Sequence, residues 1–68
     1  MESTYKVIEL VGSSRDSWED AASNAIKTAS KSLRDLRIAE VVEMDMQIED
    51  GKVVNYRTKL KVSFKYQD

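Results

Sequence analysis

Residues 5–14 read YKVIELVGSS, an apolar and β-branched run that stops at small turn-forming residues. This pattern predicts a first strand over residues 5–11 and a turn at 12–14. The apolar side chains fall on both faces of that strand, one pair on each: Val7 and Val11, then Ile8 and Leu10. A strand that is apolar on both faces needs cover on both, and one helix can cover only one. We therefore expect another subunit to cover the second face.

A helix is predicted to follow. Ser14 is suited to be its N-cap, and the acidic residues of the next turn complement the positive end of the helix dipole. Apolar residues then recur at steps of three and four, which makes one stripe that can pack on a sheet: Trp18, Ala21, Ala22, Ala25, Ile26, Ala29 and Leu33. Lysine and arginine toward its C-terminal end favour a helix that ends near Asp35 or Leu36.

Two further strands are predicted over residues 37–48 and 53–66, where apolar side chains recur at every second position. Between them, Glu49-Asp50-Gly51 favours a three-residue hairpin loop with glycine in the left-handed position. The fold class is then α+β, in the order β-α-β-β, with one domain over residues 1–68.

The loop length sets which residues of the hairpin face each other. A three-residue loop places Glu43 opposite Arg57 and Asp45 opposite Asn55. A two-residue Asp-Gly turn would instead set apolar positions opposite polar ones, so we do not favour it. In the preferred register an acidic strand lies beside a basic one, and such pairs stabilise a sheet by tenths of a kcal/mol each, roughly 0.2–1 kcal/mol.

Composition limits what this chain can do alone. It has 68 residues and no cysteine, so disulfides cannot stabilise a domain that buries little surface, and partner subunits or an ion are expected instead. The net charge of -1 gives no general attraction to nucleic acid, and the basic row on the last strand lacks aromatic residues on the same surface. No signal peptide or membrane-spanning segment is predicted, which favours the cytoplasm and argues against a membrane partner.

The sequence offers no catalytic centre. It has neither histidine nor cysteine, which removes the usual general base, the thiol nucleophile and the commonest zinc ligands. Glu43 and Asp45 share one strand face and could reach a common cation, particularly where symmetry brings several copies together. A solvated face paired with Arg57 and Lys59 is the commoner use of such alternating charges.

The order of these segments resembles the dodecin family over nearly the whole chain. The matching segments are residues 5–14 (YKVIELVGSS), 17–22 (SWEDAA), 39–43 (AEVVE) and 56–64 (YRTKLKVSF). The resemblance implies a hollow homododecamer in which a curved three-stranded antiparallel sheet partly wraps each helix. It also implies a non-catalytic protein that holds a small ligand between its subunits.

Flavin is the usual ligand of that family, stacked on a tryptophan at the start of the second strand and contacted by a glutamine on the third. Those positions correspond here to Ile38 and Arg57. An aliphatic side chain cannot replace aromatic stacking, and a fixed cation changes the hydrogen-bond pattern at the ring edge, so ordinary flavin binding is not expected. The pattern is more similar to the branch of the family that lacks the tryptophan and is associated with calcium, for which Glu43 and Asp45 would be the candidate ligands.

Three interpretations therefore stay open. The first is a shell that sequesters a small ligand or ion at altered subunit interfaces. The second is a flavin store, for riboflavin or its phosphate, that uses another stacking surface. The third is a purely structural oligomer without a ligand.

Overall fold

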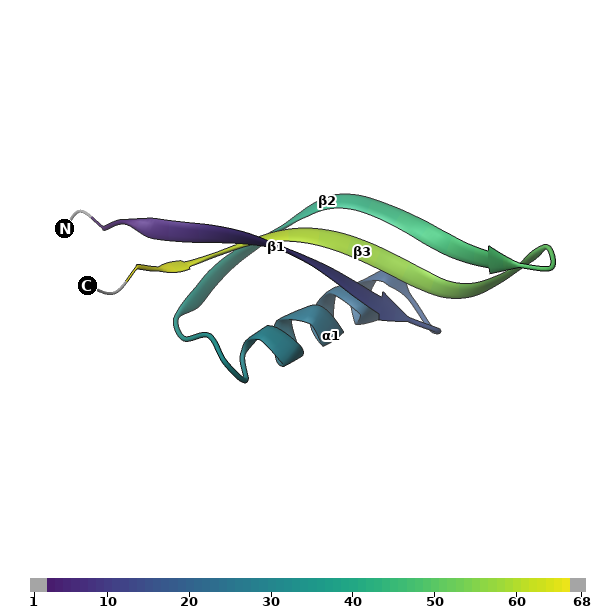
Figure 1. Cartoon of the computed structure of the whole chain (residues 1–68), viewed down its shortest axis with the longest axis horizontal. Helices are drawn as coiled ribbons and strands as arrows, with labels where there is room; N and C mark the ends of the chain where they lie inside the picture. Colours follow the sequence, from purple (N-terminus) through teal and green to yellow (C-terminus); the bar gives the residue numbers. More distant parts are fainter. Residues whose placement is uncertain (1–2, 67–68) are drawn as a thin grey trace.

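The computed structural model describes residues 3–66, and they form a three-stranded sheet with one helix (Figure 1). The elements follow in the order β1 (Tyr5–Ser14), α1 (Trp18–Ala29), β2 (Leu36–Glu49) and β3 (Lys52–Lys65). All strand pairs are antiparallel and the strand order is β1-β3-β2, so β1 and β2 are the two edges of the sheet. The predicted α+β class and β-α-β-β order are confirmed.

The core lies between α1 and two of the three strands, β1 and β3. Leu60 and Val62 of β3 are each 1% exposed and pack with Ala25 of α1. A helix is about 10 Å wide and strands lie about 4.8 Å apart, so one helix covers about two strands. We call the face that α1 covers the inner face and the opposite one the outer face. The third strand, β2, has no helix over most of its inner side.

Strand β1 runs to Ser14, so the prediction that a turn begins at Gly12 was wrong. Gly12 is a buried strand residue that pairs with Thr58. A Cβ atom at this position would overlap the backbone carbonyl oxygen of Ala21 and lie 2.9 Å from the Cβ atom of Ala25. The glycine therefore serves close packing of α1 on β1 rather than a turn.

The N-cap of α1 is Ser17, and the prediction of Ser14 was wrong. The Ser17 hydroxyl accepts a hydrogen bond from the backbone N–H of Asp20 at 2.9 Å. The Ser14 hydroxyl lies one turn earlier, where it accepts from the Asp16 N–H and donates to the Asp20 carboxylate at 2.7 Å. Both serines thus hold the loop that leads into the helix, but only Ser17 satisfies a free N–H of its first turn.

Helix α1 ends at Ala29, about two turns before the predicted end near Asp35. The Ser30 hydroxyl donates to the Ile26 carbonyl at 2.8 Å, and Leu33 N–H bonds back to Ala29, which closes the last turn. Asp35 has a φ of 59°, a left-handed conformation that no α-helix continues through. No helix in the described part of the chain is long and apolar enough to cross a membrane.

The hairpin between β2 and β3 turns at two residues, Asp50 and Gly51, so the predicted three-residue loop was wrong. Their φ angles are 50° and 74°, and two consecutive positive φ angles are typical of the type I′ turn that fits twisted hairpins. A bulge at Val54 then shifts the register between the pairs Ile48–Val53 and Gln47–Asn55. The prediction had placed this extra residue in the loop. In the structure the bulge supplies it, so that polar side chains again face polar side chains across the hairpin.

The molecule is elongated, with extents of 51 × 21 × 14 Å. The β2–β3 hairpin extends beyond α1, with its turn at one end of the long axis (Figure 1). At the other end, Tyr66 N–H donates to the Thr4 carbonyl at 2.9 Å. The first and last described strands thus begin and end side by side.

Candidate functional site

A ladder of polar pairs crosses the outer face of the hairpin. Arg57 donates two hydrogen bonds to the carboxylate of Asp45, from Nε at 2.7 Å and from an Nη atom at 2.8 Å. The next pair toward the start of β2 is Glu43 with Lys59, whose charged atoms are 3.9 Å apart. The prediction had placed Glu43 opposite Arg57 and Asp45 opposite Asn55, which was wrong by two residues of β3, one from the shorter turn and one from the bulge. An acidic β2 beside a basic β3 is confirmed.

The bidentate pair changes the acidity of both partners. Hydrogen bonding to Arg57 is the main cause that lowers the pKa of Asp45 below its ordinary value, with a partial loss of solvent working against it and charge attraction adding to it. The same hydrogen bond raises the pKa of Arg57. Asp45 is therefore held as a carboxylate that already has a cationic partner.

Glu43 and Asp45, the predicted metal ligands, lie on one face and line a small hollow of about 200 Å³ with Val11, Arg57 and Lys59. Calcium takes 6–8 oxygen ligands as a rule. Within residues 3–66, no three acidic, histidine or cysteine side chains come together as a metal-binding group. One chain thus supplies two carboxylates, both near cations, and a calcium site here needs further oxygens from backbone carbonyls, water or other copies.

Ile38 and Arg57, the predicted ligand-contacting residues, both lie on the outer face but do not meet within one chain. Ile38 lies at the start of β2 opposite Ser63 and is 67% exposed. Arg57 is six residues from Ser63 along β3, which corresponds to about 20 Å. The two positions can contribute to one site only if they come from different copies.

Trp18 lies on the inner side of the same ladder. Its Nε1–H donates to the Asp45 backbone carbonyl at 3.0 Å, and its ring meets Tyr56 edge-on with centroids 5.1 Å apart. Its own carbonyl accepts from the buried hydroxyl of Thr58 at 2.9 Å. The tryptophan is a structural link between α1 and the hairpin, as the helical stripe predicted. Thr58 was missed, although a hydroxyl within an apolar row is a signal that could have revealed it.

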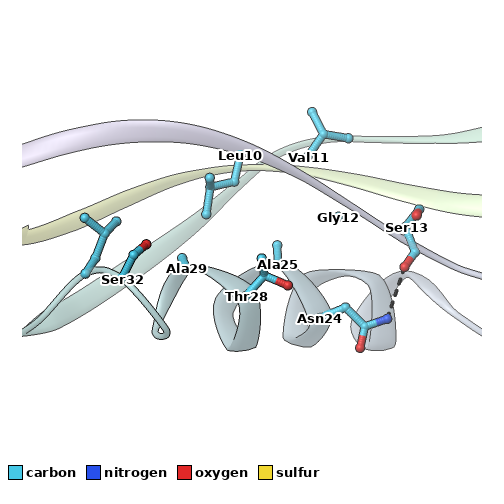
Figure 2. Close-up of a pocket in the computed structure, with 10 residues that line it drawn as sticks. Leu10, Val11, Gly12, Ser13, Asn24, Ala25, Thr28, Ala29 and Ser32 are labelled. Atoms are coloured by element: carbon cyan, nitrogen blue, oxygen red, sulfur yellow. Dashed lines mark hydrogen bonds between the residues drawn. The ribbon is translucent and has the colours of Figure 1, made fainter.

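A groove of about 450 Å³ lies between the edge of β1 and the neighbouring flank of α1 (Figure 2). It is bounded by residues 10–13 of β1 and, on the helix side, by Asn24, Ala25, Thr28, Ala29, Ser32 and Leu33. Asn24 crosses one end of it, where its side-chain N–H donates to the Ser13 carbonyl at 3.1 Å. We call this hollow the α1–β1 groove. This groove was not predicted from the sequence, although the small residues of β1 and α1 indicate it.

Sequence comparison matches nearly the whole chain to one protein family. A family model described as Dodecin matches residues 4–67. The calcium dodecin of Mycobacterium tuberculosis is 48% identical over 63 residues, which cover 93% of this chain and 89% of that protein. The dodecin of Thermus thermophilus is 37% identical over 68 residues, which cover 100% of this chain and 99% of that protein.

Solved structures agree with the sequence relatives. Dodecin from Streptomyces coelicolor superposes with a TM-score of 0.93 at 41% identity, over 97% of this chain and 94% of that one. The Mycobacterium tuberculosis calcium dodecin, described as calcium chelating with a novel calcium-binding site, superposes with a TM-score of 0.85 at 48% identity, over 96% of this chain and 93% of that one. The similarity therefore extends through every element of the fold.

Proposed function

Because this chain belongs to the dodecin family, we propose that it is the non-catalytic subunit of a hollow homododecamer that holds a small ligand or ion between its subunits. The uncovered surface of the isolated chain is the observation that carries this proposal. A compact monomer of this mass is expected to expose about 4,400 Å², whereas the chain exposes 5406 Å². The excess is of the size that each partner buries in a stable interface, about 800 Å².

The shape of the chain supports the same conclusion. Its radius of gyration is 13.9 Å, and a compact domain of this length is expected to have one of about 11 Å. The large exposed apolar side chains gather on β2, with Ile38 at 67%, Met44 at 58% and Ile48 at 60%. A two-stranded arm with such side chains is not stable alone in water, so further copies are expected to cover it.

For the ligand, we propose an ion in place of the stacked flavin. Ile38 offers no aromatic surface, and Arg57 is bound at two points to Asp45. The Mycobacterium tuberculosis relative is named for calcium, and Glu43 and Asp45 are the carboxylates of this chain that could supply oxygens to such an ion. Calcium would add charge neutralisation between copies, while Arg57 and Lys59 would have to move aside from the carboxylates.

The assembly is tested by the mass of the protein in solution. Light scattering and native mass spectrometry should give a species of twelve chains. A monomer at micromolar concentration would contradict the proposal.

The ligand is tested on the assembled protein. Calcium that binds only the folded state must raise the melting temperature, and a chelator must reverse the rise. Magnesium at the same concentration is the control for ionic strength. An unchanged melting temperature in calcium would remove the ion from the proposal, and quenching of riboflavin fluorescence by the unmodified protein would favour the flavin store instead.

A further inference from the structure

One strand of the sheet carries an apolar strip that α1 leaves largely exposed. The strip consists of four residues of β2 that lie opposite inner-face residues of β3: Ala39, Val41, Met44 and Met46. Three of their partners, Val62, Leu60 and Thr58, are buried at 1% exposure, whereas Val41 and Met44 are 52% and 58% exposed. The β2 strip therefore has a sheet beside it, and α1 only borders it across a hollow of about 370 Å³ that Ile26 shares with Ala39 and Val41.

At the opposite edge of the sheet the situation is reversed. The α1–β1 groove has a helix beside it, and within residues 3–66 no strand lies beyond β1 (Figure 2). Its helical side runs from Asn24 to Ala29, about 8 Å along the helix axis, which matches two to three residues of a strand, about 7–10 Å. Two successive strip residues on one face of an added strand would fit this length.

The backbone of both edges is also open. Because Tyr66 N–H bonds to the Thr4 carbonyl, the even-numbered residues of β1 bond to β3 and the odd-numbered ones point to the free edge. The Ser13 carbonyl does so and is held by Asn24. On β2 the parity places the strip residues at the free edge, because Lys65 N–H bonds to Asp35 and the odd-numbered residues of β3 therefore face β2. Apart from the Ser13 carbonyl, the described part of each edge can accept a further strand.

From these observations we propose that β2 of one copy adds beside β1 of the next copy, with its strip side chains in the α1–β1 groove. The proposal rests on the homo-oligomer proposed above and specifies its contact. Each strip would then be bordered by its own α1 on one side and covered by the neighbour's α1 on the other. The two surfaces differ, so the contact is head-to-tail, and within a closed shell such contacts form rings. Registers that set Glu9 beside Glu40 or Glu43 of the neighbour are excluded by charge repulsion.

Cross-linking tests this contact directly, because the chain has no cysteine of its own. Two variants are prepared with different isotope labels, Met44→Cys in the strip and Thr28→Cys in the groove. Both side chains are exposed in one chain, so the fold should be kept. After mixing and reassembly, a short bismaleimide should join the two variants at least tenfold more than it joins copies of either one alone. Glu19→Cys, exposed on the far side of α1, is the matched control and should cross-link to neither.

The outcomes separate the contact from the assembly. Efficient cross-linking of Met44→Cys with itself would show two strips face to face and overturn the head-to-tail contact, while the oligomer stands. Equal cross-linking of the Glu19→Cys control would overturn it as well. Wild-type protein that is monomeric by light scattering would refute the oligomer, and the proposed contact with it.

A pair of charge variants gives an independent test. Met44→Lys disrupts the strip and keeps the groove, whereas Thr28→Lys disrupts the groove and keeps the strip. Because each contact needs both surfaces, each variant alone should raise the concentration needed for assembly at least tenfold. Mixed together, they should form a heterodimer that cannot close, because one contact is restored and the other is not. Normal assembly of Thr28→Lys would overturn the proposal, provided that circular dichroism shows a folded chain.

Discussion

At the scale of single residues, Gly12 sets the distance between α1 and β1. The helix approaches so closely that its Ala21 carbonyl occupies the space of a side chain at this position. The alanines that face the sheet, Ala21, Ala25 and Ala29, are all buried and allow the same approach. Removing side chains from both surfaces thus brings the backbones together, which is how a short helix anchors the sheet.

Gly12→Ala should destabilise the fold, because a Cβ atom forces the helix away from β1. Overpacking of this kind costs about 1–3 kcal/mol. Urea unfolding monitored by Trp18 fluorescence measures the change. Ser13→Ala, on the exposed neighbouring residue, is the control and should stay within about 0.5 kcal/mol of the wild type. Equal effects of the two changes would contradict the role assigned to Gly12.

The ion pair of Asp45 with Arg57 makes stability depend on pH in a defined direction. The pKa of Asp45 is lower in the folded chain than its ordinary value, so the pair stabilises the fold above that ordinary value. The contribution is lost as pH falls through the lowered pKa. The difference in unfolding free energy between Asp45→Asn and the wild type should therefore become smaller under acidic conditions. At neutral pH, salt should also reduce this difference, because the pair is exposed.

Titration by carbon-detected NMR tests the cause. In Arg57→Gln, the pKa of Asp45 should return upward toward its ordinary value, whereas Lys59→Gln should leave it nearly in place. A lowered pKa that persists without Arg57 would show that another group is responsible.

At the scale of elements, the β2–β3 hairpin depends on a turn with two left-handed residues. Gly51 has a φ of 74°, and no atom lies within 4 Å of the place that a Cβ atom would take, so backbone strain alone opposes a side chain there. Gly51→Val should destabilise the chain by about 1–2 kcal/mol. Asp50→Asn is the control, because asparagine tolerates the same conformation. Thermal unfolding of both variants measures the difference, and an unchanged Gly51→Val would contradict the turn.

The elements also show which features local sequence can predict. Periodicity identified the three strands and the stripe of α1, because each depends on side chains near in sequence. The bulge at Val54 depends on pairing between strands, and the helix end at Ala29 depends on where the chain must turn back to begin β2. Those features follow from tertiary contacts, so the register of the hairpin and the end of the helix were predicted wrongly. The N-cap Ser17 instead depends on a local hydrogen bond to Asp20, which the sequence could have indicated.

At the scale of the whole molecule, the candidate site is only partly visible in one chain. The sequence predicted that Glu43 and Asp45 share a face with Arg57, and the structure brings these three together. The structure leaves Ile38 about 20 Å from Arg57 along the strands. Sequence order cannot show which residues of different copies meet, and this is why the partners of Ile38 were not predictable.

Restoring the family residues should restore flavin binding. Ile38→Trp combined with Arg57→Gln provides an aromatic surface and a neutral amide, and we expect it to quench riboflavin fluorescence at micromolar concentrations. Ile38→Leu with Arg57→Gln is the control and should not, because it lacks the stacking surface. Quenching by the control would show that Ile38 is not the residue that prevents binding.

The hydrogen bond between Tyr66 and Thr4 has a practical consequence for engineering. Any polypeptide attached before Thr4 or after Tyr66 leaves the fold from the same place, so a short linker could join the two ends into a circle. The chain could then be reopened at Asp50-Gly51, at the other end of its 51 Å axis. Fusions made beside Thr4 and Tyr66 and at this permuted opening would carry their cargo to opposite ends of each subunit.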